Sequence, residues 1–337
     1  MKKNATISKH FYLYLSKFNF KRSMNSKRRS FLKISSFLAG TAVLSNPFES
    51  AANITRKINA YDSRDSKVSI FHTNDLHGKM DACFKSFGGL KNIDRKLDEQ
   101  DITGLLLDAG GFIDKKSSFE DKLNMISAMN KVGYHVATPG DHELAAGEEE
   151  LAKLFPYMQF ELVNCNYSFQ RPDLKQMVKP FTIIYSGKFK IGITGLGKPI
   201  KNIQCKDPFN AANEVASHLK LNENCDLVIC LSQLGFDKKS KCADNKGLAE
   251  NSTYIDLIVS GNSLKSLAEQ RVFKNKISND VILSQSVRNG LLLGKTEFYF
   301  NADKRKNGLD TAQLIPGQRA DMSYASSFQE IANIKFA

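Results

Sequence analysis

Short apolar runs alternate with longer amphipathic stretches along the chain from about residue 65 onward. The longer stretches have the apolar spacing of helices that bury one face, at residues 88–100, 119–132, 147–155 and 209–223. The apolar runs are predicted to be strands, at residues 68–73, 104–110, 134–140, 160–166, 181–186, 190–197, 226–232, 255–261, 280–286 and 291–300. This alternation predicts an α/β fold.

Most of the predicted strands are continuous apolar runs, which is typical of strands in a sheet whose two faces are both covered. Several of them end in polar or turn-forming residues, in the stretches TND, DAGG, TPGDHE, SQLG and SGNS. Because an α/β protein builds its site at the carboxyl ends of its strands, we expect these endings to surround one site. Residues 303–337 are expected to be a polar, weakly patterned C-terminal tail, apart from an amphipathic hint in FQEIANI.

The positive charge of the chain is concentrated at its N-terminus. The 337 residues carry a formal net charge of +13, and residues 1–52 contain ten Lys and Arg but a single acid, Glu49. The remainder has 38 basic and 34 acidic residues, a net charge of +4. Such a balanced body argues against a surface that binds nucleic acid.

The N-terminal segment has the pattern of an export signal. Basic residues precede an apolar stretch at residues 34–44, and the small residues of 50–52 follow as a cleavage site. SKRRSFLK resembles a twin-arginine signal, with Lys27 where Ser or Thr is usual. The apolar stretch is too short for a permanent membrane anchor.

We therefore expect residues 1–52 to be a signal segment, with Met24 as an alternative start, and residues 53–66 to be a linker. The twin-arginine translocation machinery would deliver such a protein to the bacterial periplasm. The alternative is a basic tail that precedes a buried apolar helix.

The six cysteines leave two interpretations open. None forms a CxxC pair, so no zinc–thiolate site is predicted. An even count in an exported protein permits disulfides. Cys165 and Cys230, however, lie in apolar strand-like runs, which are typical of buried thiols.

Two of the strand endings carry side chains that suit a metal. Asp75 and His77 are two apart in FHTNDLHG, so both side chains can point to the same side of an extended segment. A carboxylate and a neutral imidazole suit a divalent metal such as Mn, Fe or Zn. Asp141, His142 and Glu143 follow the Pro-Gly turn of ATPGDHEL, where Asp141 also fits as the cap of the next helix.

The motifs together resemble a known family. FHTNDLHG, FGGL, LLLDAGG, MNKVGYHVATPGDHE, LSQLG, DLIVSGNS and the closing GLLLGKTEFYF are similar, in this order and spacing, to the 5′-nucleotidase branch of the calcineurin-like metallophosphoesterases. The resemblance implies a four-layer α/β/β/α sandwich of two mixed sheets, with a domain at residues 67–302. It also implies two metals that polarise a phosphoryl group and generate a hydroxide nucleophile.

The resemblance assigns the family's metal-ligand positions to this chain. Asp75 and His77 match the opening Asp and His, Asp141 stands in place of an Asn, and His142 matches the histidine that stabilises the transition state. Four of the seven ligand positions have lost their ligand type: Gly111 replaces the bridging Asp, and Gln233, Asn262 and Leu264 replace histidines.

These losses weaken the case for a dimetal centre. Without a carboxylate at Gly111, two cations would face each other with too little negative charge between them. Asp108 and Asp114 lie three residues before and after it, and neither is expected to replace the bridge.

The surviving residues allow at most one divalent metal, Mn, Fe or Zn. Asp75, His77 and Asp141 are its candidate ligands, and His142 is the candidate catalytic residue. Alternatively, the first three hydrogen-bond to one another and to the backbone.

Two functions therefore remain open. The leading hypothesis is a non-catalytic, pseudoenzyme-like protein that binds or assembles with a partner. The second is a metal-dependent hydrolase of phosphoesters, such as nucleotides, that uses one metal or a rebuilt site. The nucleotidases that it resembles carry a C-terminal domain that stacks the base, and this chain is expected to lack that domain. Either a partner chain supplies nucleotide recognition, or that recognition is absent.

Overall fold

The computed structural model describes residues 57–58, 66–99, 103–235, 243–262, 270–317 and 322–334. They all belong to one compact unit, Thr41–Ala337. The predicted export signal at residues 1–52 lies outside the described residues, as do most of the expected linker, Cys242 and Leu264.

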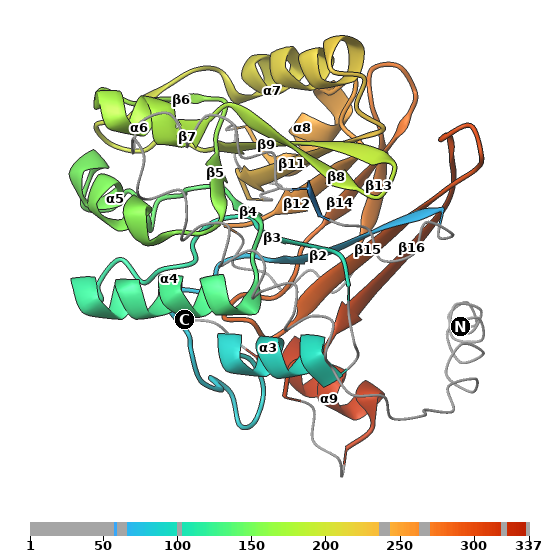
Figure 1. Ribbon diagram of the computed structural model, residues 1–337. Coiled ribbons are helices and arrows are strands. Elements are labelled where there is room, and N and C mark those ends of the chain that lie inside the picture. Colours follow the sequence, from blue (N-terminus) through green and yellow to red (C-terminus); the bar gives the residue numbers. More distant parts are fainter. Residues whose placement is uncertain are drawn as a thin grey trace, which may run out of the picture. The chain divides into compact units, whose positions relative to one another are not determined.

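Two seven-stranded sheets form the centre of this unit (Figure 1). Sheet I has the order β16 (Lys306–Leu314), β15 (Leu293–Phe300), β2 (Lys67–Thr73), β3 (Leu105–Asp108), β4 (Val136–Ala137), β5 (Glu161–Val163) and β7 (Val178–Lys179). Sheet II has the order β1 (Lys57–Ile58), β8 (Phe181–Ser186), β9 (Phe189–Gly197), β11 (Leu227–Gln233), β12 (Leu257–Ser260), β14 (Asp280–Ser284) and β13 (Arg271–Lys274). A small antiparallel pair joins β6 (Tyr167–Ser168) to β10 (Gln204–Cys205).

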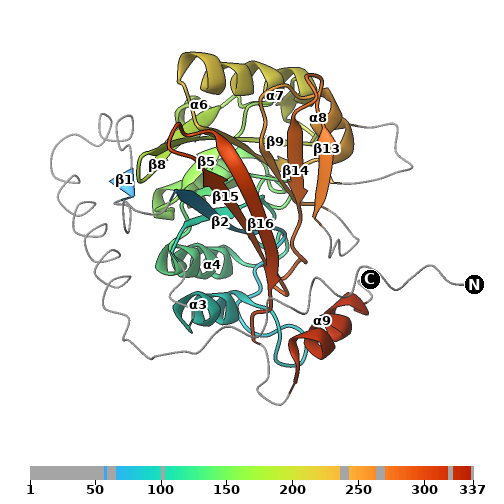
Figure 2. The same ribbon diagram turned by 90° about the vertical axis from the view of Figure 1, so that its right-hand side faces the viewer.

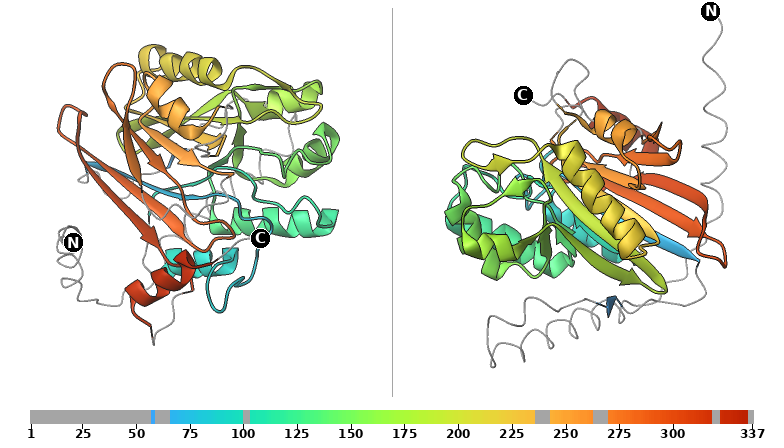
Figure 3. Two further views of the ribbon diagram at one scale, coloured as in Figure 1. Left: turned by 180° about the vertical axis from the view of Figure 1, so that it is seen from behind. Right: turned by 90° about the horizontal axis from the view of Figure 1, so that it is seen from above.

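Helices cover the outer face of each sheet, as Figures 2 and 3 show from the side and from above. Sheet I is covered by α3 (Leu90–Glu99), α4 (Phe119–Val132), α5 (Glu148–Leu154), the 3-10 turn η2 (Phe155–Tyr157) and α6 (Pro172–Met177). Sheet II is covered by α7 (Pro208–Ser217), the π-helical turn η3 (His218–Asn222) and α8 (Asn245–Asn251). The layers are therefore α/β/β/α, which confirms the predicted mixed-sheet sandwich.

The continuous apolar strands follow from this layering. In β3, Leu105 and Leu107 point into the core between the sheets, whereas Leu106 packs against the helices on the other side. Ile70 and Phe71 of β2 divide between the same two cores. Because both faces are buried, every position of such a strand favours an apolar residue.

The C-terminal region differs from the expected polar tail. Residues 306–314 form β16, which pairs antiparallel with β15, so sheet I continues beyond residue 302. Residues 306–311 are all exposed, so this strand lacks the apolar alternation by which a strand is predicted.

The first five residues of FQEIANI lie in helix α9 (Tyr324–Ala332). Its Ile331 packs with Phe87 and Leu291 in a small separate core. Within the described ranges, no helix combines the length and the apolar character needed to cross a bilayer.

Candidate functional site

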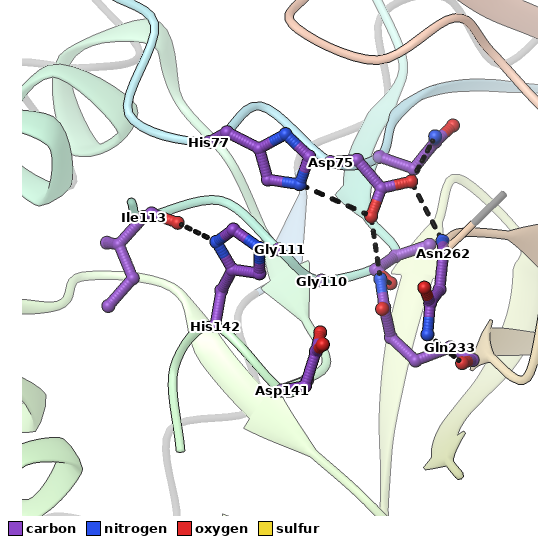
Figure 4. A network of polar contacts seen from close by, with 12 residues as sticks. Asp75, His77, Gly110, Gly111, Ile113, Asp141, His142, Gln233 and Asn262 are labelled. Carbon is purple, nitrogen blue, oxygen red and sulfur yellow. Dashed lines mark hydrogen bonds and ion pairs between the residues drawn. The ribbon is translucent and has the colours of Figure 1, made fainter. Parts of the chain in front are cut away.

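The carboxyl ends of β2, β3, β4, β11 and β12 converge on one group of polar side chains (Figure 4). In each sheet these strands run parallel, so the loops that follow them emerge at the same edge. Asp75 lies between His77 on one side and Gln233 and Asn262 on the other. The motifs at these five strand endings are thus brought to one edge, as the sequence predicted.

The loop that carries Asp75 and His77 is not extended. Both residues have left-handed backbones, with φ of 52° and 49°. The loop runs beside the one that follows β3, and the N–H groups of Asp75 and His77 donate to the carbonyls of Gly110 and Gly111, each at 2.8 Å. The expectation of an extended segment is therefore wrong, yet the side chains still meet, with 4.0 Å between Asp75 Oδ1 and His77 Nε2.

The carboxylate of Asp75 is buried and faces N–H donors. Its Oδ2 accepts from the backbone N–H of Asn262 at 2.8 Å and from Asn74 Nδ2 at 2.9 Å. Its Oδ1 lies 3.5 Å from Gln233 Nε2. Burial raises the pKa of Asp75 above its ordinary value, and these hydrogen bonds act in the opposite direction.

Gly111 faces the same carboxylate. A Cβ at this position would lie 2.8 Å from Asp75 Oδ1 and 3.6 Å from His77 Nε2. A side chain here would therefore project between the two candidate ligands, where the resemblance places a bridging carboxylate. Glycine also suits the backbone, because φ is +71°.

Gln233, the last residue of β11, lies at the centre of the site and is 1% exposed. Its Nε2 donates to the carbonyl of Ala109 and faces Asp75. The resemblance assigns Gln233 to a ligand position, but the amide turns its NH₂ group toward the carboxylate.

The two histidines of the motifs lie against each other. The rings of His77 and His142 stack with 4.3 Å between their centroids. His142 Nδ1 lies 3.0 Å from the carbonyl of Ile113, so this nitrogen carries the proton. Burial lowers the pKa of His77 to about 4, assisted by His142 and Arg288. His77 is therefore neutral at pH 7, and its contact with Asp75 is not an ion pair.

Asp141 is set apart from this group. Its carboxylate faces Lys198 Nζ at 3.9 Å, and about a third of its side chain is exposed. Within the described part of the chain, no three His, Cys, Asp or Glu side chains form a group arranged to hold a metal. The five cysteines in those ranges are free thiols.

The two aspartates that flank Gly111 are engaged elsewhere. Asp108 is fully buried and accepts from Thr73 Oγ1 at 2.5 Å and from the N–H of Gly110 at 2.8 Å. Asp114 accepts from the N–H of Lys116 at 3.0 Å within its own loop.

Sequence reasoning missed the structural importance of Glu143. This buried carboxyl accepts from the N–H groups of Gly140 at 2.8 Å, Gly111 at 3.0 Å and Ile113 at 3.1 Å. It therefore fixes the loop after β3 against the loop that carries His142. Burial raises its pKa, and the three backbone hydrogen bonds oppose that rise. Its position beside His142 was the only available signal.

Comparison with solved structures identifies the architecture. A 5′-nucleotidase precursor from Thermus thermophilus superposes with a TM-score of 0.66 at 21% identity, over 79% of this chain and 57% of that one. The calcineurin-like phosphoesterase YfkN of Bacillus subtilis gives 0.58 at 21% identity, over 78% and 96%. The chain has the metallophosphoesterase fold.

Curated relatives of this metallophosphoesterase-fold chain include 5′-nucleotidases. It is 24% identical over 300 residues to protein UshA of Salmonella pullorum, covering 78% of this chain and 54% of that protein. It is 26% identical over 271 residues to a 5′-nucleotidase of Vibrio cholerae, covering 69% and 49%. The chain thus spans about half the length of these relatives. No protein-family model matches it.

Proposed function

We propose that this chain is an exported bacterial protein whose dimetal site is largely lost, and that it binds or assembles with a partner instead of hydrolysing phosphoesters. The observation that carries the proposal is the environment of Asp75. N–H groups of Asn74, Asn262 and Gln233 face both of its carboxylate oxygens. A metal ligand must direct a lone pair at the ion, and here N–H donors face those lone pairs.

The chemistry of the side chains also fits a pair of divalent cations poorly. Gly111 supplies no bridging carboxylate, and Gln233 presents N–H groups to the centre of the site. Two nearby cations held by so few anionic ligands would repel each other. The residues of this site therefore do not suit the two-cation chemistry that the resemblance implies.

Metal content tests the proposal directly. We expect the full chain, purified with Mn²⁺ and Zn²⁺ present and then passed through a desalting column, to retain well under one ion per chain. Elemental analysis by mass spectrometry measures this. Two stoichiometric ions would contradict the proposal.

One contact favours a second candidate, a hydrolase with a single metal. Asp75 Oδ1 and His77 Nε2 are 4.0 Å apart, so a small movement toward each other would place both about 2.0–2.2 Å from one ion. Asp141 would need to turn from Lys198 to complete the set. When bound, such an ion would act as a Lewis acid on a phosphoryl oxygen, and His142 would hold a proton beside it.

Turnover distinguishes this candidate. A single-metal hydrolase should cleave a generic phosphoester or a 5′-nucleotide, and the activity should disappear in His142→Ala. If wild type and variant are equally inactive while both remain folded, the single-metal candidate is wrong.

Restoring the missing ligands tests the assignment of positions. The variant with Gly111→Asp, Gln233→His, Asn262→His and Leu264→His together should gain tight metal binding, although Leu264 lies outside the described residues. Before any ion binds, Gly111→Asp alone should destabilise the fold, because its Cβ would lie 2.8 Å from Asp75 Oδ1. A folded quadruple variant without metal would mean that the positions are misassigned.

Export through the twin-arginine machinery is part of the same proposal. The basic-then-apolar pattern of residues 1–52 supports transport by the twin-arginine machinery. Replacing Arg28 and Arg29 together by Lys should retain the protein in the cytoplasm, as measured by cell fractionation. Periplasmic recovery of that variant would rule out this route.

A further inference from the structure

The side chain of Gln233 fills a space that three glycines leave open. A Cβ built on Gly110, Gly140 or Gly261 would come within 2.9, 3.0 and 2.2 Å of Gln233 side-chain atoms. These glycines belong to three different loops, which follow β3, β4 and β12. The amide is therefore enclosed on three sides by backbone that no larger residue could replace without movement.

The same amide connects the two sheets. Gln233 ends β11 of sheet II, and its Nε2 donates to the carbonyl of Ala109, which follows β3 of sheet I. The Nε2 also reaches Asp75 in the loop after β2, 158 residues away in sequence. Within sheet II, the backbone carbonyl of Gln233 accepts from Asn262 Nδ2 at 3.2 Å. One side chain thus holds loops of both sheets at the centre of the site.

The polarity of this contact is the reverse of that in a cation site. Around a cation, ligands direct lone pairs inward, whereas Gln233 directs N–H groups outward at Asp75 and Ala109. The N–H groups carry partial positive charge, so they stabilise the buried carboxylate of Asp75 as a cation would.

The geometry points to Gln233 as a built-in substitute for a bound ion. Its amide occupies the centre of the site, satisfies Asp75 and the carbonyl of Ala109, and ties the carboxyl ends of the strands of both sheets together. With glutamine at position 233, the Oδ1 side of Asp75 needs no cation. The part about ions rests on the proposed function, whereas the part about holding the strand ends rests on the contacts of Gln233 alone.

Gln233→Glu tests the polarity. The substitution keeps the size of the side chain but places a carboxylate oxygen against Asp75 Oδ1 and the carbonyl of Ala109. We expect Tm to fall by about 5 °C or more without added metal, as loss of a buried hydrogen bond with repulsion implies. Millimolar Mn²⁺ should return at least half of that loss, because the facing oxygens then form a cation site.

Matched variants make the test specific. Gln285→Glu introduces the same change at another buried glutamine, 3% exposed, that accepts from Ser260 Oγ. Its Tm should not respond to Mn²⁺, and neither should that of the wild type. Gln233→Ala should also lower Tm, by more than Gln285→Ala, and serves if Gln233→Glu does not fold.

The outcomes separate the two ideas. If Gln233→Glu is as stable as the wild type without metal, or if Gln233→Ala costs no more than Gln285→Ala, Gln233 is not a substitute for an ion, and the proposed function stands. If the wild type itself gains Tm with Mn²⁺ and retains two ions, the proposed function fails, even where the Gln233 variants are destabilised.

Discussion

The two sheets contribute chemically different halves to the site. Among the described residues, the loops of sheet I carry the carboxyl and imidazole groups of the site: Asp75, His77, His142 and Glu143. The loops of sheet II place two neutral amides there, Gln233 and Asn262. Both halves are similarly buried, since Asp75 is 4% and Gln233 is 1% exposed.

The difference separates two ways of stabilising a buried polar site. In the half from sheet I, stability depends on protonation, because burial displaces the pKa values of Asp75, His77 and Glu143. In the half from sheet II, it depends on hydrogen bonds that no ordinary pH changes. In the dimetal centre that the resemblance implies, histidines stand at the positions of Gln233 and Asn262, so both sheets would supply ionisable ligands. In the described part of the chain, carboxylates and imidazoles face the site from sheet I alone.

The largest effect is expected at Glu143. Glu143→Ala leaves the buried N–H groups of Gly111, Ile113 and Gly140 without their acceptor and should reduce the free energy of unfolding by about 3–5 kcal/mol. Urea denaturation measures the loss. Glu143→Gln keeps one acceptor oxygen and should cost less, so equal losses for the two variants would argue against this role.

The second effect is a dependence of stability on pH. His77 has its pKa lowered to about 4 when folded, from 6.5. Between pH 6.5 and about pH 4, His77 is therefore protonated in the unfolded chain but not in the folded chain. Its contribution to the free energy of unfolding falls as the pH falls through this range. The full difference corresponds to about 3 kcal/mol.

The variant His77→Gln isolates this contribution. Its free energy of unfolding should decline less steeply than that of the wild type over the same pH range, measured by urea denaturation at several pH values. If the free energy of unfolding falls equally steeply with pH in the two proteins, the pKa of His77 is not lowered by folding. The half from sheet I would then owe no pH dependence to His77.

A smaller effect is expected at Asn262. Asn262→Ala removes the bond to the Gln233 carbonyl and places Ala at a φ of +56°, for a loss of about 1–2 kcal/mol. Asn262→Gly suits that backbone and should lose less, since the N–H that donates to Asp75 remains. For both variants, the loss in free energy of unfolding should be the same at pH 5 and pH 8. A strong dependence on pH would contradict the view that the half from sheet II is independent of protonation.

The smallest effect is expected at Asp141, at the exposed edge of the site. Asp141→Asn removes a partly exposed pair with Lys198 at 3.9 Å and should change the free energy of unfolding by less than about 0.5 kcal/mol. A loss of several times that size, measured in the same denaturation assay, would place Asp141 within the core of the network.

The layering of the fold was predictable because buried strand positions require apolar residues. Strands covered on both faces appear as apolar runs, as in the three leucines that begin β3. Helix α4 matches the predicted residues 119–132, since Ser118 caps its start and Gly133 ends it. Strand β16 was not predictable, because its exposed residues need no apolar pattern.

The site was predictable in its membership but not in its polarity. Motif order placed Asp75, Gly111, Gln233 and Asn262 at strand ends that the structure brings together. A sequence does not reveal which end of an amide faces a carboxylate, and the NH₂ of Gln233 turned to Asp75 because two acceptors lie there. Glu143 was missed because its partners are backbone N–H groups, which leave no trace in the residue types around it.

The bonds of Asn74 have a consequence for the order of folding. Its Oδ1 accepts from Ser286 at 3.0 and 2.7 Å across 212 residues, while its Nδ2 donates to Asp75. Contacts between such distant segments form only after long loops have closed, at a large entropic cost. The N–H groups of Ser286 and Asn262 should thus be among the last to become protected from hydrogen exchange during refolding. Their protection would therefore mark the end of folding.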